Sequence, residues 1–317
     1  MRTIIYALVL TTVCVSCKKE SYQNNNVLLP NNVEVFSFEP TPNTTRLPKE
    51  WVAGLNMKPV NKGVLNRVNN NYFPVYSPNR FFYLEGMPVL DYDSLVNDKL
   101  EFENDINIFF ERVLFHENWE LSQDFSRFTK KTLGWFPVEE YTVEEGQDMK
   151  KLSFYVIPEK QTKGKKIGQD IFTEFYLFNQ KDNYFSHFSH IRGFDHLSFV
   201  EKVLEGIDNG TIDAYDPIYM VDKTKRTFTI DSIYDYALAP PQKVKVREKD
   251  GSIGERIYTD QLNPREEITS VLFHEDWYFD EETLSIYKDV KALGFIRNKT
   301  GVYENSDYKI LFFITFD

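Results

Sequence analysis

One strand-like segment occurs twice in this chain, and it constrains the fold more than any other feature. The later copy reads Val-Leu-Phe-His-Glu-Asp-Trp and ends at Trp277, and the earlier copy reads Val-Leu-Phe-His-Glu-Asn-Trp and ends at Trp119. These tryptophans lie 158 residues apart, and Lys151 and Lys309 farther along the two copies keep the same interval. Isolated chance matches do not hold one spacing, so the sequence predicts a duplicated unit whose period is too long for a solenoid.

The later copy has the pattern of a strand with one buried side. Val271, Phe273, Trp277 and Phe279 fall on alternate residues, and Glu275 is the single polar residue among them. Side chains two residues apart in a strand share a face, so this alternation predicts a strand from Val271 to Phe279.

Two further strands follow this segment. Residues 280–282 make a charged turn, and a longer strand continues to Ile296, in which Gly294 marks a bulge or a close backbone approach. Asn and Gly at residues 298–301 favour a tight reversal, after which residues 310–316 form the closing strand. The sequence therefore predicts a three-stranded antiparallel meander.

A lone meander leaves one apolar face open, and a helix is the expected cover. The apolar residues between Phe199 and Ile207 recur at helical spacing, with a capping box at Ser198 and Glu201 and an Asn-Gly stop at residues 209–210. Residues 95–110 suit the corresponding helix of the first copy. The predicted fold class is α+β, with two related domains, each an antiparallel β-meander covered by a helix.

The N-terminus has the pattern of an export signal. An apolar run follows Arg2 and is too short to span a bilayer, which predicts cleavage before Cys17 and acylation of this cysteine. Plain signal-peptide cleavage nearby is the alternative. The predicted organisation is a leader over residues 1–17, a flexible Asn- and Pro-rich tether over 18–48, a first α+β repeat over 49–160 and a second α+β domain over 168–317.

The charge balance limits the partners. Lys and Arg number 37 against 48 Asp and Glu, a net charge of −11. Nucleic-acid affinity depends mainly on cationic contacts to phosphates, so nucleic-acid binding is not expected. An acidic body is also repelled by anionic lipid, so membrane contact is expected through the anchor alone.

The sequence predicts no catalytic, cofactor or metal site. It contains no Gly-x-Ser-x-Gly nucleophile motif and no glycine-rich phosphate loop. His187, His190 and His196 are the only metal-like cluster, and no carboxylate or Cys stands at an interval that would complete it. A hydrolase that uses some of the many carboxylates stays open, because such pairs cannot be recognised from spacing.

The repeated His-Glu pairs, at residues 116–117 and 274–275, do not predict a proton relay. Adjacent residues of a strand point to opposite faces, so we expect a cross-strand hydrogen bond and a charge at the sheet edge. The alternation also places Trp277 in the core. His274 and Tyr278, on the other face, are therefore the candidate protein-contact residues.

Four motifs in one order resemble the GldN/PorN family of type IX secretion and gliding motility. They are the helix with its Glu-Gly and Ala-Tyr-Asp turn at residues 205–216, the Trp strand at 272–280, the Leu-Gly-Phe-Ile strand at 293–296 and the aromatic strand at 311–314. Where family members tend to have basic residues after the Trp strand, this chain has acidic residues 280–282.

The resemblance implies a non-enzymatic scaffold or accessory of that machinery, acting through protein–protein contacts. It also implies a ring-forming outer-membrane lipoprotein as partner and a place in the cell envelope, lipid-anchored at the outer membrane and facing the periplasm. The alternative is an envelope lipoprotein that binds a ligand such as a glycan.

Overall fold

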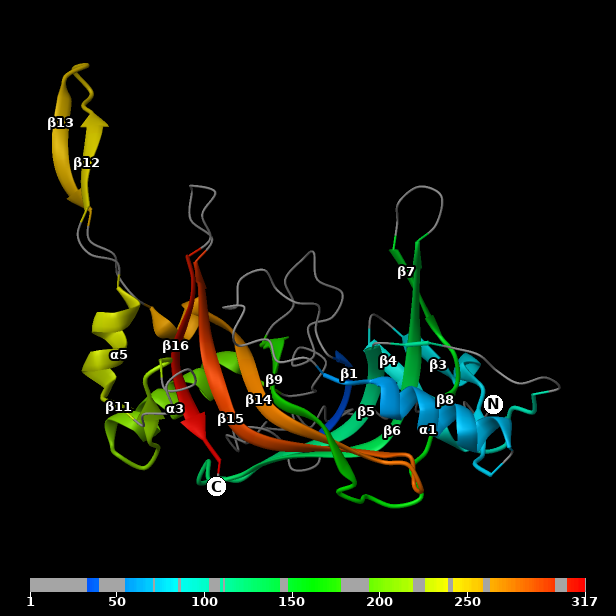
Figure 1. The fold of residues 1–317 in the computed structure, drawn as a ribbon. Coiled ribbons are helices and arrows are strands. Elements are labelled where there is room, and N and C mark those ends of the chain that lie inside the picture. The colour runs from blue at the N-terminus through cyan, green and yellow to red at the C-terminus, as the bar shows by residue number, and fades with distance from the viewer. Residues whose placement is uncertain are drawn as a thin grey trace, which may run out of the picture.

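A computed structural model describes residues 33–39, 55–70, 72–84, 87–102, 109–110, 112–142, 148–177, 194–218, 226–238, 242–258, 263–299 and 307–316. These residues form a mostly antiparallel sheet with a few helices, an α+β fold (Figure 1). The large sheet has twelve strands. None of the described helices has the length and apolar character that crossing a bilayer requires.

The second half of the chain contributes six strands, and they contain the predicted meander. In spatial order they are β9 (Lys165–Tyr176), β14 (Ile268–Asp280), β15 (Ser285–Lys299), β16 (Asp307–Thr315), β10 (Ala214–Tyr215) and β11 (Thr227–Phe228). Every neighbouring pair is antiparallel. The β14–β15–β16 meander is confirmed. Of the reversal predicted at residues 298–301, residues 298 and 299 belong to β15, and residues 300 and 301 lie outside the described residues.

The first half contributes six strands in the corresponding order. They are β1 (Val33–Glu39), β5 (Arg112–Leu121), β6 (Phe128–Thr142), then β7 (Asp148–Leu152) and β8 (Tyr155–Val156) along the far edge of β6, and β2 (Val75–Tyr76) beside β8. The tether predicted for residues 18–48 is therefore wrong at residues 33–39. Alternating Val35 and Phe36 pack on opposite faces of β5, which holds this segment in the sheet.

The two central hairpins have the same register. Trp119 of β5 lies opposite Lys130 of β6, and Trp277 of β14 lies opposite Lys288 of β15. The ladder shifts immediately before Glu117 in one hairpin and before Glu275 in the other. This leaves one extra residue on the partner strand at residue 133 and at residue 291, a β-bulge at the same place in both.

One long helix covers part of the sheet in each half. The covering helix of the second half is α3 (His196–Asp208), which buries Val200, Val203 and Ile207 against the sheet and ends at the predicted Asn-Gly stop. Its N-cap is Asp195, whose carboxylate accepts from the backbone N–H groups of residues 197 and 198, so the cap predicted at Ser198 is wrong by one turn. An Asp at this position satisfies orphan donors as well as a Ser does.

The covering helix of the first half is α1 (Lys58–Asn69), not the predicted segment at 95–110. Its buried face consists of Val60, Asn61, Gly63, Val64 and Val68. Of residues 95–110, the structure describes 95–102 and 109–110. Leu95 is the last residue of the one-turn helix α2 (Tyr92–Leu95), and the other described residues form no helix. The chain extends there because the backbone of residue 100 donates to Val75 and Lys99 forms a bridge with Tyr76.

Shorter elements complete the fold. They are the 3-10 turn η2 (Pro78–Arg80), the hairpin β3 (Phe81–Leu84) and β4 (Met87–Leu90), the helices α5 (Ile230–Ala237) and α6 (Pro264–Glu267), and the hairpin β12 (Gln242–Arg247) and β13 (Ile253–Tyr258). The β12–β13 hairpin turns at Gly251, whose φ of +87° favours glycine. It extends away from the rest of the molecule beyond α5 (Figure 1).

The two halves share their cores. One apolar cluster joins the α3 face to Trp119, Phe128 and Val35 of the first half, and another joins the α1 face to Trp277 and Ile286 of the second half. Strands β6 and β15 meet at one register point, Lys130 opposite Lys288. Each hairpin therefore reaches beneath the helix of the other half, and two separate domains are not confirmed.

Burial on β14 is two-sided rather than one-sided. Leu272 on the face opposite Phe273 is also fully buried, beneath Phe313 and Ile296. At Gly294 a Cβ would lie 2.5 Å from the Phe313 ring, so the close backbone approach is the correct alternative for this glycine.

Candidate functional site

Five fully buried charged residues meet where the two hairpins cross, and we call them the central charge cluster. They are Glu39 of β1, Glu117 of β5, Lys130 of β6, Glu275 of β14 and Lys288 of β15. Lys130 Nζ lies 2.6 Å from Glu275 Oε1, and Lys288 Nζ lies 2.8 Å from Glu117 Oε1. Each lysine thus pairs with the glutamate of the other half.

Aromatic rings repeat this exchange between halves. Lys130 Nζ is 3.7 Å from the centroid of the Phe273 ring, and Lys288 Nζ is 3.5 Å from that of Phe115. Each lysine also lies over the tryptophan of its own hairpin, at 4.7 Å and 4.9 Å. These contacts hold the ammonium groups by cation–π attraction, which is strongest where water is excluded.

Both tryptophans are tied to the cluster by the same hydrogen bond. Trp119 Nε1 donates to Glu117 Oε2 and Trp277 Nε1 donates to Glu275 Oε2, both at 2.9 Å. The expectation of a glutamate charge at the sheet edge is therefore wrong, because both glutamates are 0% exposed. The buried lysines and indole N–H groups provide the partners that such burial requires.

The cluster has one more carboxylate than it has ammonium groups. Glu39 adds a third acid, 2.7 Å from Lys288 and 3.8 Å from Lys130. Burial raises the pKa of Glu275, and the Glu39 carboxylate adds to this effect against the pull of Lys130. Burial acts the same way on Glu39, but Lys130 and Lys288 lower its pKa below the ordinary value. Protonation of Glu275 would leave two ammonium groups facing two carboxylates.

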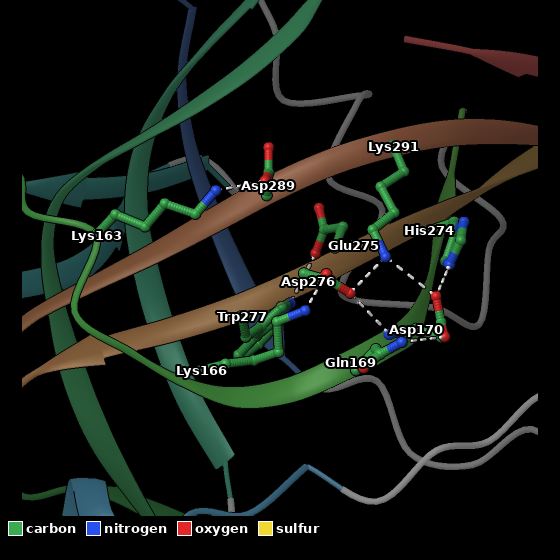
Figure 2. A network of polar contacts seen from close by, with 10 residues as sticks. All are labelled: Lys163, Lys166, Gln169, Asp170, His274, Glu275, Asp276, Trp277, Asp289 and Lys291. Atoms are coloured by element: carbon green, nitrogen blue, oxygen red, sulfur yellow. Dashed lines mark hydrogen bonds and ion pairs between the residues drawn. The ribbon is translucent and has the colours of Figure 1, made fainter. Parts of the chain in front are cut away.

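A second group of charges lies on the other face of β14, and we call it the surface polar cluster. It consists of Lys166, Asp170, His274, Asp276 and Lys291, from β9, β14 and β15 (Figure 2). Lys291 Nζ lies 3.1 Å from Asp170 Oδ1 and 2.6 Å from Asp276 Oδ1. Lys166 Nζ binds Asp276 Oδ2 at 2.7 Å, and His274 Nε2 binds Asp170 Oδ1 at 2.7 Å.

The backbone of β9 is distorted to make this cluster. The ladder between β9 and β14 shifts between Glu275 and Trp277, and Asp170 has a φ of +53°. The backbone N–H of Asp170 donates to Asp276 Oδ1 at 3.0 Å, so the strained peptide keeps a partner. A left-handed non-glycine residue is costly and is often found at functional sites.

The acids and amines of this cluster are held in their charged forms. Burial would raise the pKa of Asp170, but hydrogen bonds from His274 and Lys291 lower it to about 2. Hydrogen bonding to Asp276 raises the pKa of Lys166, and Asp276 with Asp170 raises that of Lys291 despite its burial. Burial lowers the pKa of His274, so the imidazole is neutral at pH 7. The cluster therefore presents a fixed pattern of charge.

The corresponding position of the first half is much less charged. His116 Nε2 binds Glu34 Oε1 at 2.5 Å, and the ring stacks on Phe36 with centroids 4.5 Å apart. His274 stacks on Phe172 in the same way, at 4.7 Å. The places that Asp276 and Lys291 take in the second hairpin are occupied in the first by Asn118 and a leucine.

Both predicted contact residues are partly buried. The His274 side chain is 12% exposed and stacks on Phe172. Tyr278 is half-buried on the same face, with Lys163 Nζ 4.5 Å from its ring centroid and Tyr287 beside it. Both stay predicted contact residues, since neither side chain is fully buried.

The contact between His116 and Tyr155 does not have the arrangement of a nucleophilic site. His116 Nδ1 contacts the Tyr155 hydroxyl at 2.6 Å, but burial raises the pKa of Tyr155, so this oxygen is not an available nucleophile. Within the residues that the structure describes, no three potential metal ligands converge. His187 and His190 lie outside those residues, so their metal hypothesis is untested.

Sequence reasoning missed the lysines of the central charge cluster. Lys130 and Lys288 each stand eleven residues after the tryptophan of their copy, so the 158-residue offset already paired them. The acidic partners Glu34 and Asp170 each stand two residues before the phenylalanine that stacks on histidine. Their pairing required the edge strands β1 and β9, which lie far from the hairpins in the sequence.

Residues 170–317 match the family model described as gliding motility associated protein GldN. The match confirms, for this part of the chain, the family resemblance that the motifs carry. It begins at Asp170 and includes every residue of the surface polar cluster except Lys166. The comparison with curated proteins found no match.

Proposed function

From the GldN-like character of residues 170–317, we propose that the chain is a non-enzymatic component or accessory of type IX secretion and gliding motility that acts through protein–protein contacts. The surface polar cluster is the observation that supports this proposal most. It lies in the matched region, its charges are fixed near neutral pH, and the corresponding face of the first half is much less charged.

The contact face is the exposed side of β9, β14 and β15. Tyr278 and Tyr287 lie side by side there, with ring centroids 6.1 Å apart, and Lys163 Nζ contacts both rings. Tyrosine beside a cation is typical of binding hot spots, because a large ring buries apolar area while its hydroxyl keeps a polar contact. His274 would hold this face in place through Asp170.

Capture from solubilised envelope tests the assignment. The tagged chain is expected to retain subunits of the secretion and gliding machinery, among them a ring-forming outer-membrane lipoprotein. The variant Tyr278→Ala should weaken capture about tenfold, whereas Tyr72→Ala, at a tyrosine that is 70% exposed in the first half, should not change it. Recovery of the chain alone, or with a bound oligosaccharide, would contradict the proposal.

Acylation at Cys17 would place this chain at the outer membrane, facing the periplasm, through a lipid anchor alone. Several buried acyl chains give stable attachment, because each methylene contributes about 0.8 kcal/mol. The variant Cys17→Ser should move the protein from the membrane fraction to the soluble fraction. Retention of this variant in the membrane fraction would show that another contact anchors the chain.

We also propose that the two halves are copies of one α+β unit, with a first copy over residues 49–160, extended by β1, and a second over 168–317. Equal registers, the equal bulge and the equal Trp–Glu hydrogen bonds support this duplication. The copies exchange hairpin tips beneath each other's helices, as the subunits of a symmetric dimer do. One rigid body built this way presents two related but differently charged faces.

A further inference from the structure

The β12–β13 hairpin is the most exposed regular element among the described residues. Its strands pair with each other and with no other described strand, and it extends beyond the body of the molecule (Figure 1). Ile253 is 72% exposed and Ile257 is 69% exposed. An isolated two-stranded hairpin is marginally stable in water, so a hairpin with exposed isoleucines is expected to have a covering surface.

One face of this hairpin combines apolar and cationic side chains. Lys243 lies opposite Ile257, and Arg247 lies opposite Ile253, so these four residues share a face with the cross-strand pair of Lys245 and Glu255 between them. All of them are exposed. This face, which we call the hairpin face, therefore offers two branched apolar groups with three positive charges and one negative charge, that of Glu255, around them.

The charge of the hairpin is opposite to that of the remaining chain. Residues 242–258 carry five Lys and Arg against three Asp and Glu. The whole sequence has 37 against 48, which leaves 32 against 45 outside the hairpin. A second copy of this chain therefore has the charge that the hairpin face requires.

A matching surface lies at the other end of the molecule. Tyr92 and Val96 are 47% and 45% exposed, and Asp93 between them is exposed as well. They lie in and just after α2, which follows β4, and Figure 1 shows β4 at the end of the molecule opposite β12 and β13. This surface, which we call the α2 patch, offers two apolar groups beside a carboxylate.

We propose that the hairpin face of one copy docks on the α2 patch of a second copy. The two surfaces differ, so the contact is head-to-tail and each copy keeps a free hairpin and a free patch. Such a contact extends to rings or filaments rather than stopping at a two-fold dimer. It does not use the Tyr278 face, so it is independent of the contact with secretion subunits proposed above.

Sedimentation velocity on the purified full chain, over a concentration series, tests this contact. The chain should self-associate, and the variant Ile253→Ser with Ile257→Ser should raise the dissociation constant about tenfold or more. Added salt should weaken the association, because opposite charges flank the apolar groups. A chain that stays monomeric throughout the series would overturn the proposal.

A charge exchange identifies the two surfaces. The variant Lys243→Glu with Lys245→Glu, and separately Asp93→Lys, should each self-associate about tenfold more weakly. A mixture of these two variants should associate again, because each hairpin then meets a patch of opposite charge. The control Lys131→Glu with Lys151→Glu makes the same charge change at exposed lysines elsewhere and should associate like the parent. Failure of the mixture to associate would exclude the α2 patch as the acceptor.

Discussion

The two hairpins of this protein have the same backbone and different surroundings. Both place a histidine on an aromatic ring, a glutamate on a tryptophan N–H and a lysine opposite that tryptophan. Glu39 pairs with Val113 of β5, and Phe175 pairs with Val271 of β14. Because Val113 and Val271 are 158 residues apart, Glu39 and Phe175 occupy corresponding positions. One position in this sheet can therefore hold a buried carboxylate in one copy and a phenyl ring in the other, with the same strand register.

A second pair of positions changes together. The Tyr155 hydroxyl of the first copy lies where a Cβ on Gly134 would be, so glycine is required there. The register places Ala292 at the position of Gly134 and Phe313 at that of Tyr155. In the second copy, the methyl group of Ala292 thus takes the place that the Tyr155 hydroxyl has in the first copy. In consequence His274 Nδ1 has no hydrogen-bond partner among the described residues, whereas His116 Nδ1 has Tyr155.

Removing one lysine of the central charge cluster should have the largest effect. Lys288→Met leaves Glu117 and Glu39 buried without their nearest ammonium group, which should cost about 3–5 kcal/mol of unfolding free energy. Lys130→Met should cost less, because Glu39 lies 3.8 Å from Lys130 and Glu275 has a raised pKa. Urea unfolding of both variants compares them, and an equal cost would contradict the asymmetry assigned to Glu39.

Substitution of Gly134 should have the next largest effect on the free energy of unfolding. Gly134→Ala places a methyl group on the Tyr155 hydroxyl, and overpacking of this kind costs about 1–3 kcal/mol. In the Tyr155→Phe background the same change should cost less, because the pair then matches Ala292 and Phe313. A double-mutant cycle measures the difference, and strictly additive costs would show that these positions are not equivalent.

The tryptophan hydrogen bonds provide a matched pair of variants. Trp119→Phe and Trp277→Phe each remove the donor to a buried carboxylate, which should cost about 1–3 kcal/mol. Because the partner, distance and burial agree, the two costs should agree within about 0.5 kcal/mol, the usual error of such comparisons. Thermal or urea unfolding checks this, and clearly unequal costs would break the comparison.

The smallest effect concerns pH. Burial gives His274 a folded pKa below its unfolded value near 6.5, so the folded state binds fewer protons. Stability should therefore be complete above about pH 6.5 and fall on acidification below it, by no more than about 1.4 kcal/mol per pH unit for one group. His274→Gln should flatten this part of the profile. An unchanged slope would assign the pH dependence to other groups.

The sequence predicted what depends on local pattern. Alternation of Val271, Phe273 and Trp277 predicted β14, and the Asn-Gly stop predicted the end of α3. The structure departs where long-range pairing decides: β1 is a strand stabilised by β5, and residues 98–100 extend because they pair with β2 and the residue after it. The central charge cluster joins strands from three distant segments, so no local window contained it.

An experimental structure that resolves the crossing of β6 and β15 tests the central claim most directly. Superposition of residues 112–142 and 148–156 on the residues 158 positions later should overlay the hairpins, with bulges at residues 133 and 291. Lys130 should bind Glu275, and Lys288 should bind Glu117. Different bulge positions, or lysines paired with the glutamate of their own hairpin, would contradict two exchanged copies of one unit.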